Sequence, residues 1–476
     1  MLNNDLSCAL KKQVTKLVNT VKKKSSVLNI QMTFTTKRFP SLRVNLNPEI
    51  ERLTIDQDFC ENICDKITAE LTLHRDEYVT LYYFRKDLEC TLILSDTRPD
   101  QYCESGSCCK KKTKLPHWEF HFRASIIKYE NIFDKISVDR IGPQYNKKRD
   151  DNDRDRALYK MTVELIDEKV YKSRKAVLND TAKNVKMIDI IRWVCNVFGF
   201  SSAMIIPPDN KWTYTNFIIP PSYGVESIMS FLQNAAGLGI YMDGLTSFIT
   251  RWWKKPDTLS WFICPRYGSP LCKNPIHVYV TGNDMYTGLN QNHYHEGCTT
   301  HILVTDTIDL KNWSDIGSEN AITGINYQCS PTLLDGSRFL KADDDVKAKM
   351  VASFAATTPS DPLDMQNFIR SEYHKDEGNI FRLKSMLRPP QHTTIQFKWA
   401  HAEPWTFTPG TKVTLHYDHP LGYRKFEGQV ERAVYNIMLD RQQHIDCKHI
   451  CTGLITMSCG NVVMDEVKPG IKAKES

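Results

Sequence analysis

Apolar and polar residues alternate with a period of two in the first third of the chain. Segments of this kind, rich in β-branched and aromatic residues and bounded by polar turns, predict antiparallel strands. They are Ile30–Phe34, Ile50–Ile55, Ile67–Leu73, Tyr78–Phe84, Leu88–Leu94, His117–Lys128 and Tyr159–Tyr171. The segments differ from one another and show no repeat of about 20–50 residues, which favours a sandwich or barrel over a solenoid.

The apolar spacing becomes helical beyond residue 185. Ile188, Ile191 and Val194 recur at three residues, and Gly199 ends the pattern, so we expect a helix there. A second helix is expected after Pro220–Pro221, where apolar residues recur from Val225 to Leu232 and the pattern stops at Gly237. Proline pairs at 207–208 and 220–221 predict an extended segment around residues 217–219. Together these elements indicate a compact α+β insertion.

The rest of the chain alternates between strand-like and helix-like segments. Strands are predicted at Phe248–Trp253, Leu259–Cys264, Ile276–Val280 and His301–Thr305, and helices at Asp343–Ala356 and Asp364–Leu387. A last β unit comprises Thr394–Trp399, Lys412–Tyr417, Phe426–Met438 and Thr452–Ser458. Within it, Val430 and Val434 alternate with Glu431 and Tyr435, so the valines are predicted to face the core.

The N-terminal segment has the pattern of a basic amphipathic helix. Between Asp5 and Lys24, apolar residues recur at three and four positions with lysines between them. Such a helix can lie on an anionic membrane or contact DNA. The commoner role, which we favour, is an arm that packs its apolar stripe on its own or a neighbouring subunit.

Composition excludes several classes of protein. A length of 476 residues predicts about three to four folded units, and 41% hydrophobic residues can form their cores. A net charge of +6 is too small to indicate nucleic-acid binding. The fifteen cysteines show no even framework, so reduced thiols in a cytosol-like compartment are expected. We expect no signal peptide, and charges interrupt the most apolar stretch, Gly224–Gly244.

Two clusters of metal-binding residue types occur. The first comprises Cys103, Cys108, Cys109, His117 and His121, but it lacks the paired spacing of a zinc knuckle, so free thiols in a loop are expected. The second comprises His293, His295, Glu296, Cys298 and His301. His-x-His is half of the ligand set of some zinc peptidoglycan endopeptidases, and no upstream His-x-x-x-Asp completes it. An ordinary polar loop is therefore expected.

No other motif indicates catalysis. The chain contains no Gly-x-Ser-x-Gly elbow, Walker loop or dinucleotide-binding glycine motif. Asp343–Asp345 precede a predicted helix and complement its dipole. The pairs Trp252–Trp253 and Tyr82–Tyr83 suit sugar or base stacking, but aromatic residues in strands are more often part of a core. The sequence therefore predicts no catalytic, cofactor-binding or metal-binding residue and no cofactor.

The last β unit resembles a known family. The segment from Phe407 to Val413, with its Pro409–Gly410 turn, begins a strand; residues 426–435 form the next, and residues 452–458 close the unit. This pattern is similar to the final barrel of baseplate hub proteins of contractile-tailed bacteriophages and to the base of VgrG spikes. Residues 29–172 look like the first hub barrel, and residues 188–244 resemble the domain that hubs insert between the barrels.

The resemblance implies an α+β, β-dominated fold with two tail-tube-like antiparallel β-barrels and inserted α+β and helical segments. It implies the following division: 1–28 basic arm, 29–172 first barrel, 173–330 inserted α+β domain, 331–390 helical segment, 391–467 closing strands of the second barrel, and 468–476 tail. The chain departs from the family in its basic arm, in the Cys103–Cys109 loop and in the long region 256–361.

The resemblance also implies a structural role in the virion. Hub proteins form a homotrimeric ring with six barrels that joins the sixfold tail tube, or a tube-initiator protein, to the threefold central spike. Baseplate wedge proteins surround the ring, and DNA passes through its channel without specific binding. The expected location is the tail baseplate, assembled in the bacterial cytoplasm, with no membrane anchor. The alternatives are a tail-associated cell-wall hydrolase and a nucleic-acid-binding protein that uses the Lys-rich arm.

Overall fold

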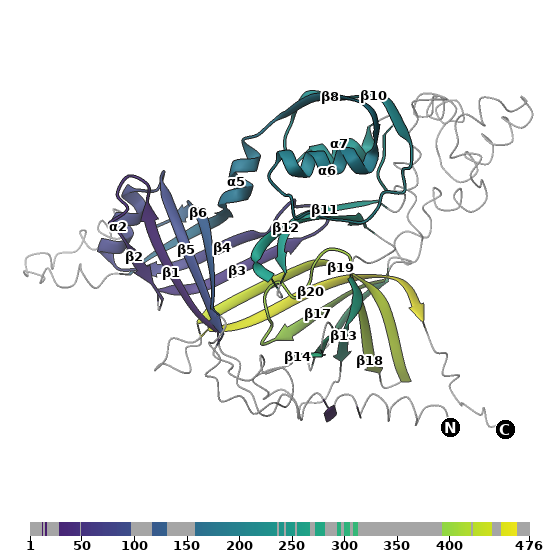
Figure 1. Cartoon of the computed structure of the whole chain (residues 1–476). Coiled ribbons are helices and arrows are strands. Elements are labelled where there is room, and N and C mark those ends of the chain that lie inside the picture. Colours follow the sequence, from purple (N-terminus) through teal and green to yellow (C-terminus); the bar gives the residue numbers. More distant parts are fainter. Residues whose placement is uncertain are drawn as a thin grey trace, which may run out of the picture.

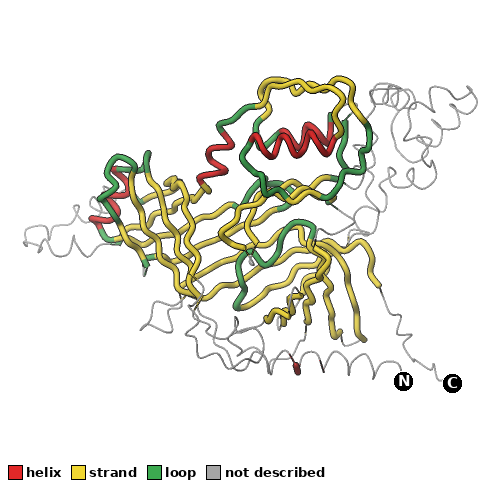
Figure 2. Tube along the Cα trace, viewed as in Figure 1, coloured by secondary structure: helices red, strands yellow, loops and turns green. Residues whose placement is uncertain are grey.

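Long antiparallel strands dominate the protein, as the period-two segments predict, and a smaller helical unit lies against them (Figure 1; Figure 2). The computed structural model describes residues 12, 15–16, 28–47, 49–96, 117–130, 158–235, 238–241, 244–252, 255–266, 272–280, 293–296, 299–304, 308–312, 393–419, 422–439 and 449–463. The predicted loops at 96–116 and 146–156 and the predicted helices at 343–356 and 364–387 lie outside these residues, apart from Asp96. The β-dominated α+β fold is confirmed.

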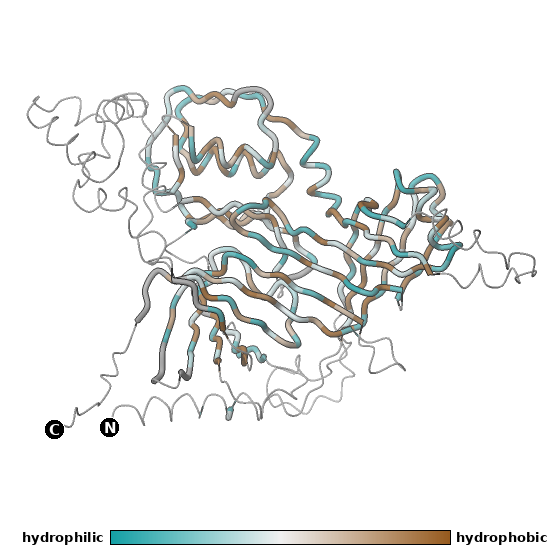
Figure 3. The backbone as a smooth tube through the Cα atoms, turned by 180° about the vertical axis from the view of Figure 1, so that it is seen from behind, coloured by the Kyte–Doolittle hydropathy of each residue, from teal (hydrophilic) through white to brown (hydrophobic). Residues whose placement is uncertain are grey.

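The N-terminal β unit contains seven of the strands. They are β1 (Leu28–Thr36), β2 (Val44–Leu46), β3 (Ile50–Asp58), β4 (Lys66–Leu73), β5 (Leu88–Asp96), β6 (His117–Tyr129) and β7 (Tyr159–Asp167). Buried residues alternate with more exposed ones along them, and Figure 3 shows the hydrophobic and hydrophilic stretches of the backbone. The apolar face of each strand therefore forms the core, and the polar face meets water.

One predicted strand of this unit is a helix. Residues 75–83 form α2 (Arg75–Tyr83), not the expected strand at 78–84. Tyr78 and Leu81, three residues apart, are the buried residues of this helix, and the Glu77 carboxylate accepts a hydrogen bond from the His74 N–H at 3.1 Å. The prediction was wrong because three aromatic residues suggested β structure, whereas capping and helical spacing decided the conformation.

A second helix shortens the last strand of the unit. The prediction extended a strand to Tyr171, but β7 ends at Asp167 and α5 (Glu168–Arg174) follows. The Asp167 side chain accepts a hydrogen bond from the Lys169 N–H at 2.9 Å. An aspartate at this position caps the first turn and so ends the strand.

Residues 168–266 form a unit with its own core. Its elements are α5, β8 (Leu178–Lys186), α6 (Met187–Val197), β9 (Met204–Ile205), β10 (Thr213–Tyr223), α7 (Ile228–Asn234), β11 (Leu245–Trp252) and β12 (Lys255–Pro265). Helices α6 and α7 lie between the β8–β10 pair and the three-stranded sheet β11-β12-β9 (Figure 1). The predicted helices at 188–197 and 225–237 and the extended segment between them are therefore confirmed. Gly199, at φ 82°, follows α6.

The C-terminal β unit begins earlier than predicted. Its strands are β13 (Cys272–Val280), β14 (His293–Glu296), β15 (Thr299–Val304), β16 (Ile308–Asn312), β17 (Thr393–Ala400), β18 (Thr411–His419), β19 (Gly422–Leu439) and β20 (His449–Val463). Strand β13 pairs in parallel with β18 and with β15. Strands β13, β14, β15 and β16 thus belong to the large sheet, although the division inferred from the sequence placed residues up to 330 in the insertion. Long-range pairing of this kind leaves no local signal.

The hairpin β19–β20 connects the two β units. The large sheet runs in the order β14-β15-β13-β18-β19-β3-β4-β7-β6-β5-β1-β20-β17-β16, and β19 also pairs with β20. The first part of β19 pairs with β18, and residues 432–438 pair with β3. Pairings therefore run in a circuit from β19 through β3, β4, β7, β6, β5 and β1 to β20 and back to β19.

A bulge in β19 changes which residues face the core. Val430 is buried as predicted, but the register with β20 shifts between Val430 and Arg432. Beyond the shift, Ala433, Tyr435 and Ile437 are buried and Val434 is only partly buried. The prediction for Val434 and Tyr435 was therefore wrong, because one extra residue in a strand moves every later side chain to the other face.

The N-terminal arm is described only at three residues before Leu28. Lys12, Thr15 and Lys16 are helical, in agreement with the predicted helix at those positions. The Lys16 ammonium lies 3.3 Å from the Glu296 carboxylate on β14, so the arm contacts its own chain there. In the part of the chain that the structure describes, no helix has the length and apolar character of a membrane span.

Candidate functional site

The connection between β17 and β18 is a buried loop. Residues 402–410 are all buried, which is unusual because connecting segments normally run over the surface. The Ala402 N–H donates to the Cys451 carbonyl at 2.8 Å, and the Thr406 hydroxyl donates to the Glu403 carbonyl at 2.8 Å. We refer to residues 401–410 as the buried loop.

Two residues of the buried loop adopt strained backbone conformations. His401 and Trp405 have φ values of 50° and 59°, in the left-handed region that side chains with a Cβ rarely adopt. Such conformations persist where surrounding contacts fix them, often at functional positions. Gly410, at φ 71°, confirms the predicted Pro-Gly turn before β18. The two strained residues lie on either side of Glu403 in the sequence, so Glu403, Trp405 and the side chains that they contact are candidates for a functional site.

The Glu403 side chain meets two histidines of β14. Glu403 Oε2 lies 2.8 Å from His295 Nε2 and 3.8 Å from His293 Nε2. The three side chains offer ligand atoms within 4.8 Å of one another. The exposed fraction of the side chain is 0% for His293, 15% for His295 and 5% for Glu403. We refer to His293, His295 and Glu403 as the His–Glu cluster.

Neighbouring side chains orient the His–Glu cluster. His295 Nδ1 lies 3.0 Å from the Thr300 hydroxyl, and the Thr406 hydroxyl lies 3.4 Å from Glu403 Oε2. The His293 ring meets Trp399 edge-on, with ring centroids 5.1 Å apart. His295 is therefore held by a hydrogen bond on the side of its ring away from Glu403, as is usual for metal-binding histidines, while His293 and Glu403 are packed against Trp399 and Thr406.

The structure brings together only part of the histidine cluster that the sequence suggested. His301 and the exposed Glu296 contact each other at 3.7 Å, away from Glu403, and Cys298 lies outside the described residues. The third member, Glu403, lies 108 residues from His295. No motif connects residues at that separation, so sequence reasoning missed it.

His301 instead belongs to a ladder of stacked rings across β14, β15, β13 and β18. Ring centroids lie 4.6 Å apart for Tyr294 and His301, 5.3 Å for His301 and His277, and 5.4 Å for His277 and His416. Burial lowers the pKa of His301 and of His416 to about 4. These imidazoles are therefore neutral at neutral pH and pack as aromatic rings.

A second polar cluster joins the two β units and the insertion. The partly buried Asp65, just before β4, accepts hydrogen bonds from Gln57 at 3.0 Å and from Thr250 at 2.8 Å. Trp405 Nε1 of the buried loop donates to the same carboxylate at 3.0 Å. Arg251, which also pairs with Asp167, adds a favourable charge. We refer to Asp65, Gln57, Thr250 and Trp405 as the Asp65 junction.

The Asp65 junction predicts a pH dependence of stability. Burial raises the pKa of Asp65 from the ordinary 3.8 to about 6, although the hydrogen bonds oppose this change. A group whose pKa is raised by folding stabilises the folded state fully below pH 3.8 and loses that contribution as the pH rises through about 6. We compare the free energy of unfolding of the wild type with that of Asp65→Asn. The wild-type value is expected to fall relative to that of the variant by about 1–3 kcal/mol between pH 4 and pH 7.

Urea denaturation at a series of pH values measures this difference, because the other carboxylates cancel between the two proteins. The control is Asp257→Asn, which removes an exposed carboxylate on β12. A difference for Asp65→Asn that does not change with pH would contradict the prediction.

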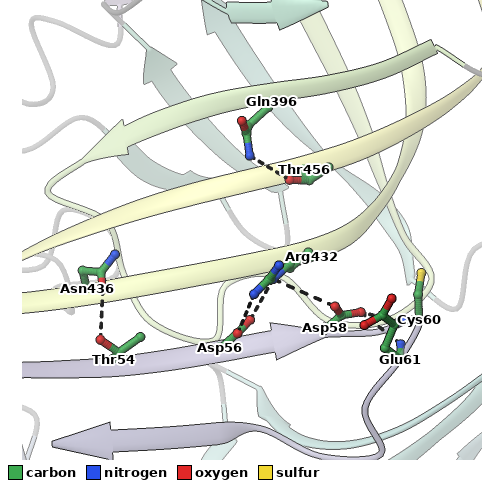
Figure 4. A network of polar contacts seen from close by, with 9 residues as sticks. All are labelled: Thr54, Asp56, Asp58, Cys60, Glu61, Gln396, Arg432, Asn436 and Thr456. Atoms are coloured by element: carbon green, nitrogen blue, oxygen red, sulfur yellow. Dashed lines mark hydrogen bonds and ion pairs between the residues drawn. The ribbon is translucent and has the colours of Figure 1, made fainter. Parts of the chain in front are cut away.

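Polar side chains also form a row on one face of the hairpin, across β17, β20, β19 and β3 (Figure 4). The Arg432 guanidinium donates to both oxygens of Asp56, at 3.0 and 2.7 Å. Thr54 donates to Asn436 at 3.0 Å, beyond this ion pair. These side chains are partly or fully exposed. The face therefore suits contact with water or with a polar partner.

The remaining candidates from the sequence do not form a site in the described residues. Cys103, Cys108, Cys109 and Asp343–Asp345 lie outside them, as does Trp253. Tyr82 and Tyr83 lie on α2, where Tyr82 stacks with Tyr78 at a centroid distance of 6.3 Å. His121 is exposed on β6, 3.7 Å from Glu119.

The chain is similar to structural proteins of phage tails and to VgrG. The tail protein from Neisseria meningitidis has 9% identity and a TM-score of 0.37, over 92% of this chain and 98% of that one. The 43 kDa tail protein of prophage MuSo2 from Shewanella oneidensis has 8% identity and a TM-score of 0.36, over 90% and 96%. The lidless PdpA-VgrG complex has 10% identity and a TM-score of 0.36, over 92% and 65%. The chain spans less than two thirds of that last chain.

A phage protein family matches within this chain. Residues 107–254 match the family described as Bacteriophage PBS1 gene 109 protein. The match begins before β6, includes the helices of the insertion and ends after β11. No curated protein sequence matches the chain. The matched family is a phage protein family, in agreement with the phage resemblance that the sequence suggested.

Proposed function

We propose that this chain is the central hub of a phage tail baseplate, a structural virion protein rather than an enzyme. The observation that carries the proposal is the hairpin β19–β20, which pairs with strands of both β units. A single chain thereby holds two β units in a fixed relation, the first antiparallel and the second mixed because β13 pairs in parallel with β15 and β18. The similarity to phage tail proteins supports the same structural role.

Two β units per chain suit an adaptor between rings of different symmetry. Three copies around a threefold axis present six β units, which can meet a sixfold tube on one side and a threefold spike on the other. In this proposal each unit is a tube-like barrel. The pairing circuit through β3, β4, β7, β6, β5, β1 and the hairpin corresponds to the first barrel, and strands β13–β20 form the second.

The proposed division of the chain follows the cores. The first barrel comprises residues 28–167, the insertion residues 168–266, and the second barrel residues 272–463, with the hairpin shared between the barrels. The insertion is a separate unit because it has a hydrophobic core of its own, whereas the two β units share one continuous hydrophobic core.

The proposal specifies partners and location. The homotrimer would contact the tail tube or a tube-initiator protein above, the central spike below and wedge proteins around it, and DNA would cross the channel without specific binding. The protein would be assembled in the bacterial cytoplasm and remain in the tail baseplate of the virion.

Electron microscopy of the purified full-length protein, mixed with the tube and spike proteins encoded beside it, tests the proposal. We expect a threefold ring with the mass of three chains and six β units around an open channel. A particle that stays monomeric with both partners would contradict the hub assignment. A lytic zone in a cell-wall zymogram would favour the hydrolase, and salt-sensitive DNA binding lost on removal of residues 1–24 would favour the nucleic-acid-binding alternative.

A further inference from the structure

We propose that the His–Glu cluster is a structural site for a divalent transition metal, with zinc as the natural occupant. The site would join β14, at the end of the large sheet, to the buried loop after β17. This inference does not depend on the hub assignment, because it rests on the geometry and chemistry of three side chains.

The ligand types select the class of metal. Two imidazole nitrogens and one carboxylate oxygen suit zinc and its neighbours among the transition metals, whereas magnesium and calcium prefer oxygen ligands throughout. The expectation of an ordinary loop rested on the absence of an upstream His-x-x-x-Asp motif that would supply the missing ligand. Glu403 supplies that ligand from the buried loop.

The distances fit an ion after small adjustments. Metal–ligand bonds of about 2.0–2.1 Å in a tetrahedron place neighbouring ligand atoms about 3.4 Å apart. The two contacts of Glu403 Oε2, at 2.8 and 3.8 Å, lie on either side of that value, and all three ligand atoms lie within 4.8 Å. The 3.8 Å separation of His293 Nε2 and Glu403 Oε2 is longer than a hydrogen bond, and an ion bound to both atoms would lie about 2.0–2.1 Å from each.

The surrounding hydrogen bonds suit a metal-bound histidine. When His295 binds through Nε2, its Nδ1 carries the proton and donates to the Thr300 hydroxyl, which lies 3.0 Å away. The Thr406 hydroxyl, which donates to the Glu403 carbonyl at 2.8 Å, lies 3.4 Å from Glu403 Oε2 and packs against the carboxylate. Contacts of this kind set the tautomer and orientation of metal ligands.

Charge and burial indicate a structural rather than a catalytic ion. Glu403 has an exposed fraction of only 5%, and a carboxylate buried to this extent needs positive charge nearby. A divalent ion supplies that charge. Since the three side chains are 0–15% exposed, the ion would be largely shielded from solvent, with water as its fourth ligand.

The position of the site gives the metal a mechanical role. Strand β14 has only four residues and pairs with β15 at one end of the sheet order. Short edge strands open easily unless another element holds them. An ion shared between β14 and the buried loop would hold this edge close to β17.

Metal analysis of the full-length protein tests the site. After chelation and dialysis, the wild type is expected to take up one zinc ion per chain and to unfold at a higher temperature with zinc than without it, whereas magnesium has no effect. Glu403→Gln should lose this zinc ion, and Thr300→Val should weaken zinc binding about 10–100-fold. Glu296→Gln, on the same strand but exposed, is the matched control and should bind zinc as the wild type does.

Cobalt distinguishes this site from the cysteines. Cobalt in the His–Glu cluster is expected to give the visible spectrum of a tetrahedral ion without the thiolate-to-cobalt band that ligands such as Cys103 would produce. A wild type that shows neither stoichiometric zinc nor this spectrum would overturn the proposal, even if the variants fail to fold. So would zinc that is lost in Cys103→Ser and retained in Glu403→Gln.

Discussion

Gly428→Ala is expected to destabilise the protein by about 3 kcal/mol or more and to reduce its soluble yield sharply. Gly428 lies in the middle of the hairpin, where the register of β19 on β20 shifts between Glu427 and Gly428. A Cβ added there would lie 2.2 Å from the Ser458 carbonyl oxygen and 2.9 Å from its carbon. Both are backbone atoms of the paired strand, so the clash cannot be relieved by turning a side chain. Urea denaturation of the purified variant measures the loss.

Gly224→Ala is the control for this substitution. The nearest atom to a Cβ at Gly224 is the Ala176 carbonyl oxygen, at 3.7 Å, an ordinary contact distance. This variant should retain the stability of the wild type within about 1 kcal/mol. If Gly428→Ala were equally stable, the close approach of β19 to β20 would be wrong, and with it the shared hairpin on which the proposed function rests.

Val430→Asp is expected to cost several kcal/mol and to prevent assembly of the ring with its partners. Val430 is only 5% exposed in the core that both β units share. A carboxylate at this position would be buried without a cation or a hydrogen-bond donor placed for it. Denaturation midpoints and the mass of the particle formed with the tube and spike proteins measure the two effects.

Val434→Asp is the matched control, because the bulge turns Val434 away from the core. Val434 is partly exposed, whereas its neighbours Ala433 and Tyr435 are fully buried. We expect this variant to lose less than about 1 kcal/mol. Lys425→Ala, which removes an exposed ion pair with Glu427, should be nearly silent as well. Equal damage from Val430→Asp and Val434→Asp would show that both valines face the core and that the bulge is misplaced.

The local spacing of apolar residues predicts much of the fold. The helix at 187–197 and most strands of both β units follow from the period of their apolar residues, whereas β2, β14 and β16 were not predicted, and β14 replaces the polar loop that was expected there. The predicted strands were wrong at two places where a capping residue starts a helix instead. Asp167 ends β7, and His74 with Glu77 begins α2. Aromatic residues in these segments indicated β structure, but a capped first turn stabilises a helix through backbone donors that no strand propensity describes.

The candidate sites were beyond the reach of sequence patterns. His293 and His295 stand out as a His-x-His pair, but their third member is Glu403, which no spacing connects to them. Asp65 has no motif at all, and its raised pKa results from burial beneath segments far away in the chain, among them those that carry Thr250 and Trp405. Chain separation hides such clusters, because any of the 56 acidic residues can meet a given histidine once the chain folds.

The sequence by itself determined the local elements of this protein, the β-dominated class and the resemblance to phage tail proteins, because alternation and helical spacing are properties of short segments. The tertiary structure decided the rest. The register of β19 on β20 selected which valine is buried, and the pairing of β13 with β18 assigned residues 272–280 to the large sheet. The buried loop placed Glu403 beside two histidines. Each of these depends on contacts between residues far apart in the chain, whose energies exist only when the fold has formed.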